Sequence, residues 1–159
     1  MTQRLNAAAL APDLYKAYYA FSVALKKGVI GEALTDLIHI RVSQINGCAF
    51  CVDMHVKEAT IHGERALRLH HLAIWRESPL FTPKERATLA WAESVTRLGE
   101  HGVPDDVYEE ARMHFNEKEL VELTFIVMEI NGWNRLSIAL RNQPGSMDAA
   151  MGLAAAGLS

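Results

Sequence analysis

The sequence predicts an all-α domain of about six to seven helices, and two observations support this prediction. Apolar residues recur at helical spacing in one segment after another, and residues typical of helix starts precede several of these segments. In addition, no alternating apolar–polar run is flanked by an Asn-Gly or Asp-Gly turn, which is the pattern typical of a β-hairpin. We therefore expect every regular element to be a helix.

The first two helices are predicted from how they begin and end. A first helix should cover residues 12–28, because Pro12 suits the first helical turn and two lysines followed by a glycine are typical of a C-terminus. A second should run over residues 32–45, where an apolar stripe at helical spacing has one polar member, Arg41. The pair Asn46-Gly47 then ends this helix directly before the first cysteine.

The middle of the chain contains the clearest capping signal. A third helix is expected over residues 48–63, with both cysteines at its start, and a fourth over residues 64–75. The next helix should cover residues 82–98, because Thr82 can cap it and Glu85 completes a capping box. These three segments are therefore expected to follow one another as separate helices.

Two more helices and a tail complete the predicted domain. A short helix should begin at residues 102–104, and a second capping-box pattern opens a long helix over residues 117–140. Residues 120–130 are apolar on nearly every side of that helix, which is typical of a core or an oligomer interface. The tail, residues 144–159, is rich in small residues and should fray or dock weakly. We therefore expect one domain over residues 1–143.

Length, composition and charge limit the class of protein. A chain of 159 residues, half of them hydrophobic, fits one globular domain that buries roughly two-thirds of its unfolded surface. The net charge is -3 and no basic stripe occurs, so nucleic acid is not expected as a partner. The N-terminal segment lacks the apolar core of a signal peptide, and no stretch approaches about 18 uncharged apolar residues. We expect a soluble, cytoplasmic protein that does not bind a membrane.

The two cysteines, Cys48 and Cys51, are the strongest chemical signal. They stand three residues apart, whereas a disulfide scaffold joins distant segments of small secreted chains. A helix that begins at Cys48 places both thiols, His55 and His62 on one face, although we expect His62 to be structural. The helix dipole favours a thiolate at Cys48, and His55, one turn after Cys51, can accept its proton. The pattern predicts a redox-active dithiol.

Two other interpretations of the cysteines stay open, and a third fails. Both thiols can be small buried hydrophobes beside a satisfied core histidine. Alternatively, the cysteines and His55 could be three ligands of a structural zinc ion, with His39 or Asp36 as the fourth, although the sequence has no second CxxC and we expect no metal. A thioredoxin-like motif is excluded because it belongs beside a βαβ pattern, and none occurs.

The segment Leu37–His55, which contains the run Asn-Gly-Cys-Ala-Phe-Cys-Val-Asp-Met-His, closely resembles the alkylhydroperoxidase D-like (AhpD-like) branch of the carboxymuconolactone decarboxylase family. The resemblance extends over roughly residues 34–141 and includes the Trp75–Ser78 turn, the Thr82 helix and the segment Ile130–Arg135. It implies an all-helical protein that assembles as a homo-trimer or homo-hexamer. In the best-known branch, such proteins reduce hydroperoxides through the CxxC pair.

The resemblance also implies roles for individual residues. Cys51 would attack the peroxide, Cys48 would be the resolving thiol, and His55 would belong to a proton relay. That relay begins in the family at a carboxylate twelve residues before the first cysteine, usually a glutamate, and here this position is Asp36. The aspartate is one methylene shorter, and its side of the helix, taken alone, also fits a solvated face. Phe50 stands where some relatives have a histidine.

The leading functional hypothesis is a thiol-dependent alkyl hydroperoxide reductase that cycles through a Cys48–Cys51 disulfide. It would act on a small hydroperoxide, need no cofactor, and be recharged by a dihydrolipoyl or thioredoxin-like dithiol donor protein. Two alternatives are a lactone decarboxylase, which is the other activity associated with the family and needs no dithiol, and a non-enzymatic redox-sensing oligomer.

Overall fold

The chain folds into helices throughout, which confirms the all-α prediction. The computed structural model describes residues 2–158, and within that range it contains nine α-helices, two short 3-10 helices and no strand. Seven of the helices match predicted ones, and the two additional ones are four-residue helices that are too short to show a sequence period. The elements are α1 Ala7–Leu10, α2 Pro12–Leu25, α3 Glu32–Asn46, α4 Ala49–Ile61, α5 Ala66–His71, η1 Leu72–Ile74, α6 Pro83–Thr96, α7 Asp105–His114, α8 Glu117–Leu140, α9 Asp148–Met151 and η2 Leu153–Ala156.

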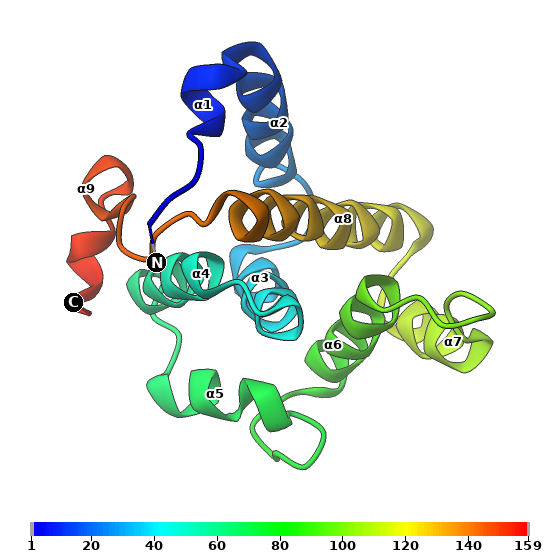
Figure 1. The fold of residues 1–159 in the computed structure, drawn as a ribbon. Helices are drawn as coiled ribbons and strands as arrows, with labels where there is room; N and C mark the ends of the chain where they lie inside the picture. The colour runs from blue at the N-terminus through cyan, green and yellow to red at the C-terminus, as the bar shows by residue number, and fades with distance from the viewer. Residues whose placement is uncertain (1, 159) are drawn as a thin grey trace.

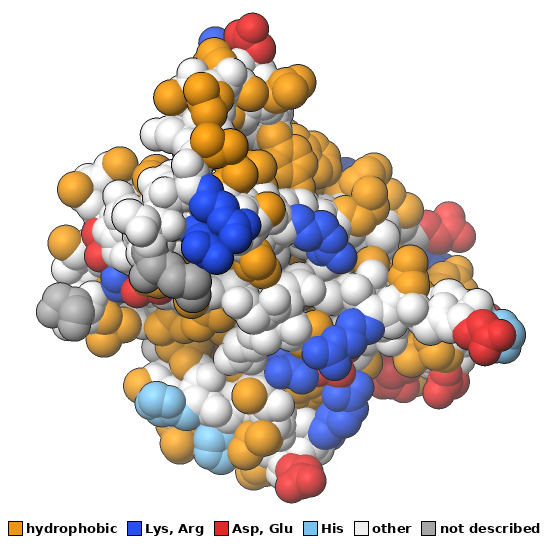
Figure 2. All heavy atoms as spheres, in the orientation of Figure 1, with side chains coloured by type: hydrophobic (Ala, Val, Ile, Leu, Met, Phe, Trp, Pro, Cys, Tyr) orange, Lys and Arg blue, Asp and Glu red, His pale blue; other side chains and the backbone are white. Residues whose placement is uncertain are grey.

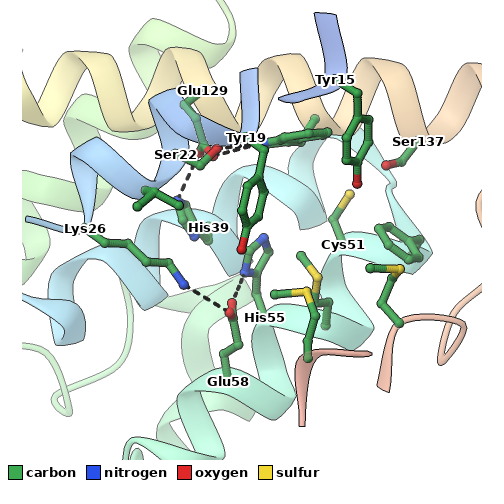
Figure 3. Close-up of a pocket in the computed structure, with 16 residues that line it drawn as sticks. Tyr15, Tyr19, Ser22, Lys26, His39, Cys51, His55, Glu58, Glu129 and Ser137 are labelled. Carbon is green, nitrogen blue, oxygen red and sulfur yellow. Dashed lines mark hydrogen bonds and ion pairs between the residues drawn. The ribbon is translucent and has the colours of Figure 1, made fainter. Parts of the chain in front are cut away.

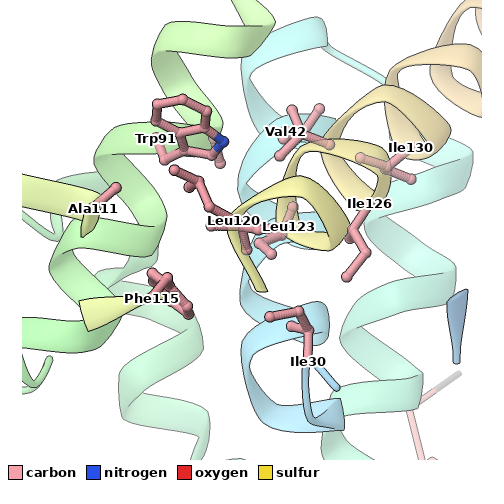
Figure 4. Packing of buried hydrophobic residues seen from close by; sticks show 12 residues of the cluster. Ile30, Val42, Trp91, Ala111, Phe115, Leu120, Leu123, Ile126 and Ile130 are labelled. Carbon is pink, nitrogen blue, oxygen red and sulfur yellow. The ribbon is translucent and has the colours of Figure 1, made fainter. Parts of the chain in front are cut away.

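Helix α3 lies at the centre of the molecule, with α4, α6 and α8 packed around it (Figure 1). Its apolar residues point to two sides. Ile38 and Val42 belong to a core formed with α6, α7 and α8, part of which Figure 4 shows, whereas Leu37 and Ile40 belong to a second core with α4, η1 and α6. Because α3 is covered on both sides, this arrangement also buries three of its polar residues, Asp36, His39 and Ser43.

Local signals set the helix boundaries. Thr82 and Glu85 form the predicted capping box of α6, in which the backbone N–H of Glu85 donates to Thr82 Oγ1 at 3.3 Å and that of Thr82 donates to Glu85 Oε2 at 2.7 Å. Asn116 caps α8 in the same way. Gly47 ends α3 in the left-handed conformation, with φ of 71°, where a residue without a Cβ is favoured.

Helix α2 crosses the long helix α8 and covers its middle (Figure 1). The Tyr18 hydroxyl donates to the carbonyl oxygen of Glu129 at 2.7 Å. A Cβ on Gly132 would lie 2.0 Å from that hydroxyl, so this close approach requires a glycine in α8. One face of α8 is buried in the core, but Phe125 and Met128 on the outer face are exposed, so the core does not cover every side of the apolar stretch. Figure 2 shows hydrophobic side chains gathered over α1, α2 and the adjoining part of α8.

The C-terminal segment, which was expected to fray or to dock weakly, folds back and packs on α4. Leu153 of η2 is 2% exposed. The ammonium group of Lys57 lies 2.8 Å from a carboxylate oxygen of Asp148 and 3.0 Å from one of Asp53. The backbone N–H of Gly145 donates to the same Asp53 oxygen at 2.9 Å. Within residues 2–158, no helix is long and apolar enough to cross a membrane.

Candidate active site

The two cysteines lie where α4 begins, as predicted. Cys48 is the N-cap residue, and its sulfur accepts a hydrogen bond from the backbone N–H of Cys51 at 3.3 Å. The two residues form a disulfide with a Cα–Cα distance of 5.3 Å, within the usual range. Both side chains are 1% exposed. The site thus contains a closed dithiol pair at a helix N-terminus, where backbone N–H groups favour a thiolate once the pair is reduced.

An amide network holds the turn before Cys48 against α8. Asn46 Nδ2 donates to Asn131 Oδ1 at 3.0 Å and to Asn134 Oδ1 at 2.8 Å. Asn134 is fully buried, and its Nδ2 donates to Ser43 Oγ at 3.0 Å. Our sequence reasoning did not foresee this network. The two asparagines of α8, three residues apart in an apolar helix, are the signal that could have suggested it.

A pocket opens beside the disulfide, between α2, α3, α4, α8 and the C-terminal segment (Figure 3). Cys51 is one of the residues that line this pocket, whereas Cys48 is not. The lining is polar at one end and largely apolar elsewhere. Its members are Tyr15, Tyr19, Ser22, Val23, Lys26, His39, Phe50, Cys51, Met54, His55, Glu58, Glu129, Trp133, Ser137, Met147 and Met151.

His55 is the buried imidazole of the polar end. Its Nδ1 lies 2.7 Å from Glu58 Oε2, and the Lys26 ammonium group lies 3.3 Å from the other carboxylate oxygen of Glu58 (Figure 3). Burial lowers the pKa of His55, which favours the neutral ring. Burial alone would raise the pKa of Glu58, but its hydrogen bond and charge interactions with His55, together with Lys26, outweigh this effect and lower that pKa to about 2.

These contacts decide the proton positions on the His55 ring. The ionised Glu58 carboxylate can only accept a hydrogen bond, so Nδ1 of the neutral ring is the donor and Nε2 carries the lone pair. Within residues 2–158, Nε2 is buried and has no hydrogen-bond partner. His55 is therefore oriented as a base with its accepting atom free.

A second histidine–carboxylate pair completes the polar end. His39 Nε2 lies 3.3 Å from Glu129 Oε2, and the His39 and His55 ring centroids are 4.5 Å apart. Ser22 and Trp133 donate hydrogen bonds to Glu129 Oε1. Burial raises the pKa of Glu129, but the ion-pair contact with His39 and the hydrogen bond from Ser22 outweigh burial, and the net effect lowers this pKa. Both glutamates are thus held ionised inside the protein.

Asp36 is buried, at 5% exposure, so it does not occupy a solvated face. The structure pairs its carboxylate with His62, whose Nδ1 lies 2.7 Å from Asp36 Oδ2, and not with His55. Helices α3 and α4 run antiparallel, so a residue near the start of α3 meets the end of α4, two turns beyond His55. Asp36 does not line the pocket, and burial raises its pKa. The structure brings together Cys48, Cys51 and His55 but places Asp36 elsewhere.

Two glutamates of the pocket were missed by the sequence reasoning. Glu58 follows His55 by three residues, a helical spacing that could have indicated it. Glu129 lies in the apolar stretch of α8 and has no local signal. His39, His55 and Glu58 offer ligand atoms within 4.8 Å of one another, so they could also hold a metal ion. The zinc set considered from the sequence does not form, because the cysteines pair with each other and Asp36 pairs with His62.

Known proteins resemble most of the chain in sequence. The model of the carboxymuconolactone decarboxylase family matches residues 12–94. The uncharacterized protein YdfG of Bacillus subtilis (strain 168) is 39% identical over 146 residues, which are 92% of this chain and 99% of that protein. The uncharacterized protein YnjA of Escherichia coli (strain K12) is 31% identical over 136 residues, which cover 84% of this chain and 66% of YnjA.

Solved structures agree with this assignment. ATU0492 of Agrobacterium tumefaciens, a protein of unknown function linked with the antioxidant defence protein AhpD, is 40% identical and has a TM-score of 0.87, with 90% of this chain and 98% of that chain covered. A peroxidase-related protein from Ralstonia eutropha JMP134, with an alkylhydroperoxidase AhpD core, shares the fold at 24% identity, a TM-score of 0.77, and coverage of 87% and 74%. The chain is therefore an AhpD-like member of the carboxymuconolactone decarboxylase family.

Proposed function

We propose that this protein is a thiol peroxidase that reduces organic hydroperoxides through the Cys48–Cys51 dithiol. One observation carries the proposal: Cys51 and His55 line the same pocket, one helical turn apart on α4, and the buried Nε2 atom of His55 has no hydrogen-bond partner within residues 2–158. A thiolate is the nucleophile that attacks a peroxide, and a buried base beside the thiol generates it. Membership of an AhpD-like family supports the same chemistry.

The first step oxidises Cys51. His55 Nε2 takes the proton from the Cys51 thiol, and the thiolate attacks one peroxide oxygen of ROOH. The O–O bond breaks, a sulfur–oxygen bond forms, and the leaving alkoxide takes the proton back from His55 to become ROH. Glu58 is a positioning residue in this step, because its hydrogen bond to Nδ1 keeps the lone pair on Nε2.

The second step closes the disulfide. The Cys48 thiol attacks the sulfur of the Cys51 sulfenic acid, the sulfur–sulfur bond forms, and hydroxide leaves with the Cys48 proton as water. The sum is one dithiol plus ROOH to one disulfide, ROH and water. A dihydrolipoyl or thioredoxin-like dithiol protein then supplies two electrons and two protons to reopen the pair. In this scheme the enzyme is a cytoplasmic homo-oligomer, a trimer or hexamer, that needs no cofactor.

The test is peroxide consumption by the reduced protein together with mass spectrometry of its cysteines. Cys51→Ser should abolish consumption, whereas Cys48→Ser should consume about one equivalent and accumulate a Cys51 sulfenic acid that a dimedone probe traps. His70→Ala, at an exposed histidine of α5, is the control for loss of a histidine. Equal consumption by wild type and Cys51→Ser would contradict the proposal.

The two alternative functions predict different outcomes. A lactone decarboxylase would turn over a carboxymuconolactone at a rate that thiol alkylation leaves unchanged. A redox-sensing oligomer would change its assembly state on oxidation, measured by light scattering, and would show no peroxide turnover with any dithiol donor.

A further inference from the structure

The pocket at Cys51 has two chemically different walls. One contains the two histidine–glutamate pairs, His55 with Glu58 and His39 with Glu129. The remaining lining is dominated by thioether and aromatic side chains, from Phe50, Met54, Trp133, Met147 and Met151. The proposed reaction takes place at the boundary between the two walls, where Cys51 lies. A bound ROOH would therefore direct its peroxide group to the polar wall and its R group to the apolar wall.

The C-terminal segment supplies two of the apolar side chains. Met147 immediately precedes α9 and Met151 ends it, and both are half-buried beside the pocket. Figure 3 shows this segment passing along the side of the pocket that faces away from α8. The family model ends at residue 94, so these methionines are outside the part of the chain that the model matches.

Three separate contacts fix the segment in place. Lys57, which is 5% exposed, bridges Asp148 and Asp53. Gly145 donates its backbone N–H to Asp53, and Leu153 is buried against α4. The ion pairs of Lys57, the hydrogen bond from Gly145 before α9 and the buried Leu153 after it hold the two methionines against the pocket rather than in solvent.

We infer that Met147 and Met151 determine substrate specificity by selecting hydroperoxides with a bulky apolar R group over hydrogen peroxide. The inference rests on the proposed function, since it assigns the substrate class of that site. Methionine is flexible and polarizable, so it adapts to R groups of different shape. Hydrogen peroxide has no R group and makes no contact with these methionines. An aryl or branched alkyl group, in contrast, keeps its apolar surface exposed to water unless it packs on the methionine side chains.

The experiment compares kcat/KM for cumene hydroperoxide with kcat/KM for hydrogen peroxide in the full-length enzyme. Met147→Ala and Met151→Ala should each lower the ratio of the two values by roughly five- to tenfold, because each removes about three heavy atoms of apolar contact. Met147→Leu and Met151→Leu keep an apolar side chain and should keep the ratio near the wild-type value. Met113→Ala removes an exposed methionine of α7 and is the matched control. Unchanged ratios in both alanine variants would overturn the inference.

A binding measurement separates this inference from the proposed function. The redox-inert alcohol 2-phenyl-2-propanol has the R group of cumene hydroperoxide, and Trp133 lines the pocket, so binding can be followed by tryptophan fluorescence. The alanine variants should weaken binding of the alcohol by a similar factor, and Met113→Ala should not. If the wild type consumes no peroxide but this pattern is found, the peroxidase proposal fails and the apolar wall stands. No binding by the wild type, or equal binding by all variants, would overturn the inference.

Discussion

Two carboxylates pair with histidines along α4, one within the helix and one at its C-cap, and only the first pair borders the pocket. Glu58 holds His55 beside Cys51, whereas Asp36 holds His62 at the far end of the same helix. The distance is 2.7 Å in both pairs. The pairs differ in exposure, because the His55 side chain is 6% exposed and that of His62 is 33% exposed. Two carboxylate–imidazole contacts of the same length thus lie in different surroundings, one buried and one partly exposed to solvent.

The physical consequence is seen in the pKa values. Burial lowers the pKa of His55 and favours the neutral base. For His62, the hydrogen bond to Asp36 is the largest effect and raises the pKa, which favours the charged ring. A neutral imidazole with a free lone pair can accept the proton of a thiol, and a charged one cannot. In the proposed mechanism, the His55 pair therefore transfers the proton and the His62 pair has a structural role.

The largest expected effect concerns the two histidines. His55→Ala should lower the rate of Cys51 oxidation by roughly a hundredfold or more, because a general base is lost. His62→Ala should leave this rate near the wild-type value. The rates are measured by stopped-flow mixing of the reduced proteins with peroxide. Similar losses in the two variants would break the distinction between the pairs.

The next effect distinguishes the two carboxylates. Glu58→Gln should lower the same rate by roughly tenfold, since the amide has no charge to stabilise the protonated His55 during the reaction. Asp36→Asn is the matched isosteric control at the other pair. If Asp36→Asn lowers the rate as much as Glu58→Gln, the relay implied by the family resemblance operates and our assignment of Glu58 is wrong.

The pH dependence should separate the pairs in a different way. The folded pKa of His55 is below its ordinary 6.5, so the ring stays neutral at pH 6.5. The oxidation rate should therefore hold as pH falls through 6.5 and decline only at lower pH, where the ring becomes protonated. Glu58→Gln removes a charge that favours protonated His55, so the acid limb should move to lower pH. His62→Ala should leave the acid limb in place. The profile is that of the peroxide oxidation rate, and an acid limb above pH 6.5 would contradict this prediction.

The smallest effect is on stability and concerns the structural pair. His62→Ala should lower the free energy of unfolding by about 1–2 kcal/mol, because it leaves the buried Asp36 without its partner. The folded pKa of His62 is raised, so the contribution of this group is complete below its unfolded value near 6.5 and is lost as pH rises through the folded pKa. Urea unfolding of wild type and variant at about pH 6 and about pH 9 should therefore give a larger difference at the lower pH. A difference that grows with pH would contradict the expected sign.

Features that depend on neighbouring residues in the chain could be predicted from the sequence. The capping box of Thr82 and Glu85 places the start of α6, and Asn46-Gly47 separates α3 from the cysteines. His55 stands four residues after Cys51, and the helical repeat alone places the two side chains on the same face of α4. These interactions close within one or two turns, so no knowledge of helix packing is needed to find them.

Only the tertiary structure decided which groups meet across helices. Asp36 stands at the spacing that the family resemblance assigns to the relay, but the antiparallel packing of α3 on α4 pairs it with His62. The same packing brings His39 to His55, and α8 adds Glu129 from an apolar stretch of sequence. The helical repeat sets the angular position of a side chain on its own helix. The rotation and offset of one helix against another depend on how all the buried side chains fit together.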